Sequence, residues 1–483
     1  MNEFELKFQV PADRVPAVEA DLQRGTVERT ALHARYFDTP DEALARAQLV
    51  LRVRQEGDLW VQTAKGPGQG SFDRLEHNVQ LPAAPGAIPD LARHAGHPVH
   101  RLLERALDGK LPGLQPVFDI DVTRLSRALN VEGSSIEVAL DRGQIRHGDL
   151  SLAVSELEFE LKDGAAVAVI ELARSWCGMH GLWLDPLSKS ALGRRLARGE
   201  STGPAMSAKP LDKGGRHLLA AIFDAAMQQV LGNARELAAG TGHEGHVHQL
   251  RVGLRQVRTA LRELQDAGAW DPLGPELDLA IRTLFTTLGE HRDRSTLIPA
   301  LLREMSGAAS PVQPWQPELP DVGAAVRDRA VQDAFLRLVA LAQQLRDGSG
   351  TAPRALRQLT GDRLRSLHGR MAKKGRRFEE LPQADRHQVR KRLKRLTYIA
   401  ELVRPLYDLD AVDAYVRSLK KLQDALGRYQ DAVAGRLLFE QQAREVPSAW
   451  FGAGWLAARE EQLAAACAKA CRRAARKAKP FWT

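Results

Sequence analysis

The spacing of apolar residues changes near the middle of the chain, and this change constrains the fold more than any other feature. Before residue 200, apolar and polar residues alternate in short runs at 3–10, 49–55, 59–65, 72–81, 118–125, 135–141 and 151–162. From Arg216 onward, apolar residues recur every three or four positions. A period of two is typical of strands and a period near 3.6 is typical of helices. The sequence therefore predicts an α+β chain, with an antiparallel sheet followed by an all-helical region.

A linker and several shorter segments complete this prediction. Residues 199–213 are rich in Gly, Ser and Pro, which predicts a boundary between domains at 1–203 and 214–483. In the first domain, helices are expected at 12–24, 89–107 and 165–180, and hairpin turns at Gly57-Asp58 and 66–70. In the second domain, the Pro-rich residues 310–320 are expected to form a loop between helices.

The charges are divided unevenly between the two halves. Residues 1–204 contain 24 Lys and Arg against 29 Asp and Glu, whereas residues 205–483 contain 45 against 31. The first half therefore carries −5 and the second +14. A strongly basic half predicts a polyanionic partner, which on charge alone could be nucleic acid, a membrane surface or polyphosphate.

Several expected strands carry their charges in rows. Because side chains alternate along a strand, the members of each of the following groups lie on one face of their own strand: Glu3, Glu5 and Lys7; Arg52 and Arg54; Glu156, Glu158 and Glu160. Such faces can simply be solvated. Like charges in line repel, however, unless a cation or counter-charge lies between them. If these faces point inward, the sheet would surround acidic groups for metal ions and basic groups for phosphates.

These residues resemble, in order, the landmarks of CYTH domains, the triphosphate tunnel metalloenzymes. The opening Glu3-Phe-Glu5-Leu-Lys7 fits the E-x-E-x-K pattern. The later landmarks are Tyr36-Phe-Asp38-Thr39, Leu51-Arg52-Val-Arg54, Thr63-Ala-Lys65-Gly66, Arg74-Leu-Glu76, Ser155-Glu156-Leu-Glu158-Phe-Glu160 and Ser188-Lys189. The resemblance covers residues 1 to about 200. It implies a closed antiparallel β-barrel, or tunnel, that binds triphosphate-containing substrates together with a divalent metal.

The chemistry of the side chains fits this expectation. Magnesium or manganese prefers oxygen ligands, for which the candidates are Glu3, Glu5, Glu156, Glu158 and Glu160. The candidates for phosphate binding are Lys7, Arg52, Arg54, Lys65, Arg74 and Lys189. Catalytic roles are expected for Glu5, Lys65 and Glu158, in the hydrolysis of tripolyphosphate to pyrophosphate and phosphate. A carboxylate of the acidic row is expected to orient the attacking water.

The helical half repeats two motifs. The pattern H-x-x-R-x-x-x-[RK] occurs at 248–255 and 387–394, and L-G-x-x-x-D occurs at 288–293 and 426–431. The first His and the last Asp lie 45 residues apart in one copy and 44 apart in the other. Two landmarks at nearly equal separation predict a duplicated helical bundle.

The repeated motifs resemble those of the CHAD family, over residues 214–483. The resemblance implies two pseudo-symmetric helical bundles that bind inorganic polyphosphate without chemistry of their own. The expected contacts are His248, Arg251, Arg255, Arg258, His387, Arg390, Lys391, Lys394, Lys420 and Lys421. Thr397 departs from the pattern, because this position is often basic in the second copy.

Other functions remain open at this stage. The chain could be a non-catalytic, granule-associated polyphosphate-binding protein, or its tunnel could act on thiamine triphosphate or a nucleotide. Few aromatic residues interleave with the basic stripes, so specific nucleic-acid binding is not expected. No apolar run approaches the twenty or so residues that cross a membrane, and no signal-peptide core is present. We expect a cytoplasmic protein, in some conditions associated with polyphosphate granules, and no membrane partner.

Overall fold

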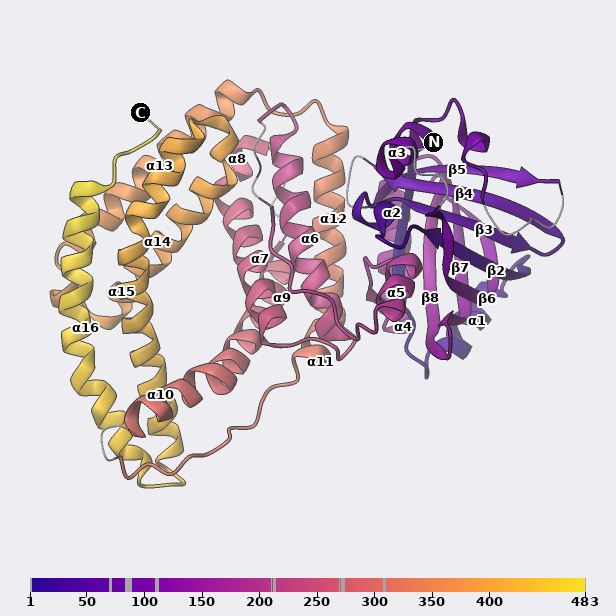
Figure 1. The fold of residues 1–483 in the computed structure, drawn as a ribbon. Helices are drawn as coiled ribbons and strands as arrows, with labels where there is room; N and C mark the ends of the chain where they lie inside the picture. The colour runs from indigo at the N-terminus through magenta and orange to yellow at the C-terminus, as the bar shows by residue number, and fades with distance from the viewer. Residues whose placement is uncertain are drawn as a thin grey trace. The chain divides into compact units, whose positions relative to one another are not determined.

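The protein is described here by a computed structural model. It describes residues 2–68, 72–82, 89–108, 113–209, 211, 214–268, 270, 274–306 and 310–482. An antiparallel sheet occupies the first half of the sequence and helices occupy the second, as the apolar periods predict (Figure 1). The chain forms two compact units. The first comprises residues 1–206, 231–246 and 323–343, and the second comprises 207–230, 247–322 and 344–483.

The sheet contains nine strands in the order β5-β4-β3-β2-β6-β7-β8-β1-β9. The strands are β1 (Asn2–Gln9), β2 (Glu28–Asp38), β3 (Val50–Glu56), β4 (Leu59–Pro67), β5 (Asp73–Leu81), β6 (Gln115–Val131), β7 (Ser134–His147), β8 (Leu150–Asp163) and β9 (Trp183–Leu184). All pairings are antiparallel. Strand β1 pairs with β8 and also, over three residue pairs, with β5, which brings the two ends of the strand order together.

Most helices of the first half lie on the outer face of this sheet, and the last of them packs against its inner face at Phe118. They are α1 (Val15–Leu22), α2 (Ala43–Arg46), η1 (Leu91–His94), α3 (Pro98–Leu107), α4 (Ala166–His180) and α5 (Lys189–Ala197). Phe8 of β1 and Trp176 of α4 both contact the Phe159 ring, with ring centroids 5.6 and 5.9 Å apart. A second cluster packs Val99 and Leu103 of α3 against the strands. Apolar side chains such as Phe8 and Phe159 therefore pack outward against helices, whereas Leu32, Tyr36 and Ile120 lie on the inner face, where Leu192 of α5 packs against them.

The seven expected strands are all present, but other elements differ from the prediction. The sequence did not predict β2, β9, α2 or α5. The prediction of one helix at 89–107 is wrong, because Gly96 adopts a φ of +83° and Pro98 starts a new helix. The turn at Gly57, with a φ of +59°, joins β3 to β4 as predicted. The expected turn at 66–70 extends outside the described residues.

The second half is helical from Leu218 onward. Its elements are α6 (Leu218–Ala238), α7 (Glu244–Glu263), α8 (Gln265–Gly268), α9 (Gly274–Arg292), η3 (Asp293–Leu297), α10 (Ile298–Ser306), α11 (Val322–Arg327), α12 (Arg329–Asp347), α13 (Pro353–Gly375), η4 (Phe378–Glu380), α14 (Gln383–Leu402), η5 (Arg404–Leu406), α15 (Leu409–Gln442) and α16 (Ala449–Lys477). The Pro-rich residues 310–320 form no helix or strand, as predicted. Within the described parts of the chain, no helix is both long and apolar enough to span a membrane.

Candidate active site and basic cluster

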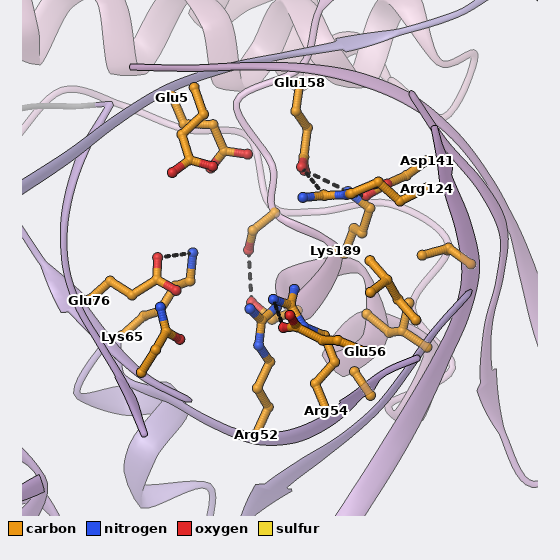
Figure 2. Close-up of a pocket in the computed structure, with 18 of the residues that line it drawn as sticks. Glu5, Arg52, Arg54, Glu56, Lys65, Glu76, Arg124, Asp141, Glu158 and Lys189 are labelled. Atoms are coloured by element: carbon orange, nitrogen blue, oxygen red, sulfur yellow. Dashed lines mark hydrogen bonds and ion pairs between the residues drawn. The ribbon is translucent and has the colours of Figure 1, made fainter. Parts of the chain in front are cut away.

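The inner face of the sheet surrounds a cavity of about 420 Å³ lined mainly by charged side chains. Nine residues that the sequence predicts for the site line it: Glu5, Lys7, Arg52, Arg54, Lys65, Arg74, Glu158, Glu160 and Lys189. Figure 2 shows Glu5 and Glu158 on one side of the enclosed space and Arg52 and Arg54 on the opposite side. We call these two sides the acid wall and the cationic wall.

The register of the strands builds the acid wall. On β1 and β8, Glu5 lies opposite Glu160, Lys7 opposite Glu158, and Gln9 opposite Glu156. On β7 and β8, Glu137 lies opposite Glu160 and Asp141 opposite Glu156. Residues opposite each other in an antiparallel pair have side chains on the same face. Three neighbouring strands therefore bring their carboxylates to one side of the cavity.

Lys189, the first residue of α5, lies among three of these carboxylates. Its Nζ is 2.9 Å from Asp141 Oδ2, 2.5 Å from Glu156 Oε2 and 2.6 Å from Glu158 Oε1. Ser188 places it there by capping α5, since its side chain accepts a hydrogen bond from Ala191 N. These carboxylates are largely neutralised by protein cations.

Arg124 of β6 adds a second cation to the acid wall. Its guanidinium donates two hydrogen bonds of 2.7 Å to Asp141 and contacts Glu158. Burial opposes the ionised form of Glu158, but Lys189 and Arg124 hold its pKa well below the usual range. Burial, together with the charge of Glu158, raises the pKa of Glu156 to about 7. The two neighbouring glutamates therefore differ in how readily they ionise.

The cationic wall has the opposite character. Burial and the neighbouring charge of Arg52 lower the pKa of Arg54. Burial would raise the pKa of the Tyr36 hydroxyl, but Arg52, Arg54 and Lys65 lower it below its ordinary value. Counter-charges are present, because Lys65 contacts Glu76 at 2.7 Å and Arg54 contacts Glu56. The wall nevertheless keeps a positive field, which favours an anion in the cavity.

Two predicted metal ligands, Glu3 and Glu156, are not among the described residues that line the cavity. The Glu3 side chain is outside the described residues, although its backbone pairs with Arg74 on β5. Glu156 is 1% exposed and lies behind Lys189. The sequence placed Tyr36 and Glu76 in motifs without giving them a role, and it did not identify several other residues that line the cavity, namely Glu56, Arg124, Glu137, Asp141 and Lys162.

The donors of the acid wall fit a hard divalent cation in their chemistry, since all are carboxylate oxygens. Among the described residues, no three carboxylate, imidazole or thiol groups are already arranged to hold a metal ion together. Magnesium usually binds through one or two carboxylates, with water and substrate phosphates as its other ligands. Glu5, Glu158 and Glu160 on the cavity surface could supply such ligands.

The helical half contains a second group of positive charges, formed by α7, α9 and α14. We call Arg251, Arg255, Arg292, Arg390 and Lys394 the basic cluster. Arg251 donates to Leu288 O at 3.0 Å, and Arg251 and Arg255 each lie 5.1 Å from the centre of the Phe285 ring. Arg255 also donates to the Tyr398 hydroxyl at 3.4 Å. These contacts hold the guanidinium groups in place.

The basic cluster has too few acids to neutralise it. Burial, followed by the charge of Arg255, lowers the pKa of Arg251 to about 10 and that of Lys394 to about 8. Burial and Arg255 also lower the pKa of Arg390. Cations with lowered pKa values are crowded and gain stability when an anion binds.

The other predicted contacts of the helical half differ in their surroundings. Burial lowers the pKa values of His248, His387 and Arg258. His387 Nδ1 lies 3.1 Å from Gln430 Oε1, and Arg258 lies 3.6 Å from Asp278. Lys420 is 70% exposed and lies 3.2 Å from Asp424, and Lys391 and Lys421 are also exposed.

Comparison with known proteins identifies both halves. Residues 1–191 match the family model of the CYTH domain, and residues 221–440 match that of the CHAD domain. The chain therefore carries a CYTH domain followed by a CHAD domain, in the order that the sequence predicts.

The curated proteins that are similar to the chain include the following two. An inorganic triphosphatase of Haemophilus influenzae (strain ATCC 51907 / DSM 11121 / KW20 / Rd) is 29% identical over 207 residues, which are 41% of this chain and 55% of that protein. The chain thus spans little more than half the length of this relative. An uncharacterized protein of Mycobacterium tuberculosis (strain CDC 1551 / Oshkosh) is 27% identical, over 98% of this chain and 96% of that protein.

Solved structures resemble each half separately. The CHAD domain from the plant Ricinus communis covers 58% of this chain and 98% of its own, at 23% identity and a TM-score of 0.47. A putative adenylyl cyclase from Hippeastrum covers 41% of this chain and 97% of its own, at 16% identity and a TM-score of 0.30.

Proposed function

We propose that the protein is a metal-dependent inorganic triphosphatase that hydrolyses tripolyphosphate to pyrophosphate and phosphate. The observation that carries this proposal is one cavity with an acid wall facing a cationic wall (Figure 2). Such a cavity can bind a polyanion on one side and a divalent cation on the other. The CYTH match and the similarity to an inorganic triphosphatase of H. influenzae support the reaction class.

In this proposal the strands β1–β8 act as a closed barrel. The support for closure is that β1 pairs with both β8 and β5. The CYTH domain of residues 1–203 would then be a tunnel, and residues 214–483 would form the second domain. The paired motifs on α7 and α14 support two pseudo-symmetric bundles in that domain.

The divalent cation, magnesium or manganese, would be held by Glu5, Glu158 and Glu160, with contributions from Glu3 and Glu156. When bound, it neutralises phosphate charge and lowers the pKa of a water molecule. Arg52, Arg54 and Lys65 bind the phosphate oxygens, and Lys7 and Arg74 extend this positive surface. A water oxygen attacks the terminal phosphorus, the bridging P–O bond breaks, and its electrons leave on pyrophosphate. A carboxylate of the acid wall accepts the water proton.

An inorganic substrate is favoured over an organic triphosphate. Among the described residues that line the cavity, Tyr36 is the only aromatic one. Its ring already stacks on Phe118, with centroids 4.6 Å apart and planes inclined by 17°. A nucleobase or thiamine ring commonly stacks on an aromatic side chain, and the described lining of the cavity offers none besides Tyr36.

Phosphate release tests the proposal. Tripolyphosphate, ATP and thiamine triphosphate are incubated with wild type, Glu5→Gln and the control Asp119→Asn, each with Mg²⁺, Mn²⁺ or EDTA. Asp119 pairs with Arg35 and does not line the cavity, so its variant keeps wild-type activity. Metal-dependent release chiefly from tripolyphosphate is expected, with kcat lowered at least about tenfold in Glu5→Gln. Release chiefly from ATP or thiamine triphosphate would refute the inorganic substrate, and no release would refute the enzyme.

We further propose that the helical half binds inorganic polyphosphate, which would also permit association with polyphosphate granules. The support is the basic cluster, in which burial and the repulsion between neighbouring cations lower the pKa values of Arg251, Arg390 and Lys394. The double variant Arg251→Met/Arg390→Met is compared with Arg365→Met, an exposed arginine on α13. The double variant should weaken binding and reduce the slope of log Kd against log salt by about one per lost phosphate contact. Equal binding by all three proteins would contradict the proposal.

A further inference from the structure

A buried chain of polar contacts leads from the acid wall to helix α6. Gln9 follows Lys7 on the inner face of β1. Its Nε2 donates to Asp185 Oδ2 at 3.0 Å and lies 3.4 Å from Glu156 Oε1. Arg235 of α6 donates from Nε to the same Asp185 oxygen at 3.2 Å. Asp185 is fully buried, so these donors, rather than water, satisfy its carboxylate.

Asp185 also fixes the segment that leads to Lys189. Its Oδ1 accepts a hydrogen bond of 2.9 Å from Leu187 N, and its own N–H donates to Lys7 O at 2.9 Å. Two residues beyond Leu187, Lys189 begins α5 and reaches the carboxylates of the acid wall. Asp185 therefore fixes both the β1 backbone at Lys7 and the segment that directly precedes Lys189.

Arg235 supplies the positive charge that this aspartate needs. A buried carboxylate is costly unless it is paired and hydrogen-bonded. Arg235 is 11% exposed and also contacts Glu236 Oε1 at 3.1 Å, and Glu236 in turn contacts Arg195 at 2.6 Å. Residues 231–246 belong to the same compact unit as the sheet, although they lie within the CHAD match.

We propose that Asp185 and Arg235 are positioning residues of the tunnel. They hold Glu156 and Lys189 in place through Gln9 and the 185–188 segment, and thereby set the affinity of the acid wall for a divalent cation. A residue inside the CHAD match thus contributes to the chemistry of the CYTH domain. This inference deepens the proposed function, since it assumes that the acid wall binds the metal.

Mn²⁺ binding and kinetics of the full chain test the inference. Free Mn²⁺ is measured by electron paramagnetic resonance for wild type, Asp185→Asn, Arg235→Met and Arg235→Lys, and kcat and KM are measured with tripolyphosphate. Asp333→Asn is the matched control. It breaks the 2.8 Å contact between Arg174 and Asp333, which joins other elements of the same unit away from the cavity.

Asp185→Asn and Arg235→Met should weaken Mn²⁺ binding by about tenfold or more. They should lower kcat more than they raise KM, because the cationic wall is unchanged. Arg235→Lys should recover part of the loss, and Asp333→Asn should match wild type. If either charge variant fails to fold, Gln9→Met takes its place, because it cuts the chain of contacts without removing a charge.

Three outcomes overturn the inference: wild-type Mn²⁺ affinity in the Asp185 and Arg235 variants, an equal loss in Asp333→Asn, or no Mn²⁺ binding by wild type. Failure of the proposed function is distinguishable from these. A wild-type protein that binds Mn²⁺ but releases no phosphate refutes the triphosphatase, and its Mn²⁺ affinities still decide the roles of Asp185 and Arg235.

Discussion

Single side chains of the basic cluster carry charges that depend on their neighbours. Lys394 is the clearest case, because burial and the charges of Arg255 and Arg390 lower its pKa to about 8. Its ammonium group is therefore present at pH 7 and is lost as the pH rises through about 8. A polyanion binds the charged form more tightly, so binding and protonation are linked.

Polyphosphate affinity should fall between pH 7 and pH 9 for this reason. In Lys394→Arg the positive charge persists over this range, so the decrease should become smaller. Isothermal titration calorimetry at the two pH values measures the difference. Lys469→Arg, an exposed position on α16, serves as the control and should keep the wild-type pH dependence. An unchanged pH dependence in Lys394→Arg would assign the effect to another group.

At the scale of elements, helix α5 depends on a close contact with the sheet. A Cβ atom on Gly193 would lie 2.3 Å from the Phe118 ring, which is itself buried against Tyr36. Gly193→Ala should therefore shift α5 and cost about 1–3 kcal/mol of stability. Because Lys189 begins the same helix, phosphate release should fall as well.

Urea unfolding and phosphate assays measure both effects. Gly454→Ala is the control, since a Cβ there has no atom within 4 Å and the substitution lies within helix α16. It should stabilise the protein by about 0.5–1 kcal/mol. Wild-type stability in Gly193→Ala would show that α5 does not need this contact.

The η1 segment contains a buried histidine that must stay neutral. Gln62 Oε1 accepts from Asp90 N at 2.9 Å, so its Nε2 faces His94 Nε2 at 3.0 Å. The remaining proton of His94 then lies on Nδ1, 3.0 Å from His77 Nδ1. Burial and the charge of His77 lower the pKa of His94 to about 4.

Stability should accordingly fall on acidification. The unfolded chain binds this proton near pH 6.5 and the folded chain near pH 4, so stability decreases between these values. The loss from pH 7 to pH 5 is up to about 2 kcal/mol. His94→Gln should lose less than wild type on the same pH change in urea unfolding, and the exposed control His217→Gln should lose as much. A wild-type loss in His94→Gln would place the effect elsewhere.

The sequence predicts helices, strands and rows of like charge along one strand better than it predicts which side chains lie opposite each other on neighbouring strands. The rows of Glu156, Glu158 and Glu160 and of Arg52 and Arg54 are visible because they repeat along one strand. Arg124 and Asp141 have no charged residue two positions away on their own strands, and they become part of the site only through the pairing of β6 with β7. That register depends on contacts distant in sequence, which periodicity does not contain.

Strand β2 shows a related limit. Buried Leu32, Ala34 and Tyr36 alternate along it without a turn residue between them. Alanine and arginine are frequent in helices as well, so this alternation alone did not identify a strand. Asp185 and Arg235 carried no signal in the sequence, because neither belongs to a row or a repeat. Their proximity to Gln9 arises only from the folded chain.

At the scale of the whole molecule, the cavity and the basic cluster should act independently in their main functions. Glu5→Gln should lower kcat for tripolyphosphate hydrolysis at least about tenfold while polyphosphate affinity stays at the wild-type value. Arg251→Met/Arg390→Met should weaken polyphosphate binding and leave tripolyphosphate hydrolysis at the wild-type rate, since these residues do not line the cavity. Both assays on both proteins measure this directly. A loss of both functions in either variant would show that the two sites are coupled.

The outward packing of the strands has an evolutionary consequence. Apolar residues such as Leu6 and Phe8 stabilise the fold from the outer face of the sheet, while half-buried charges such as Arg54 work against it. Selection for thermal stability alone would therefore favour replacing the inner charges with apolar residues, and would fill the cavity at the expense of its chemistry. A substitution such as Arg54→Leu should therefore raise the stability of the protein while it weakens phosphate binding.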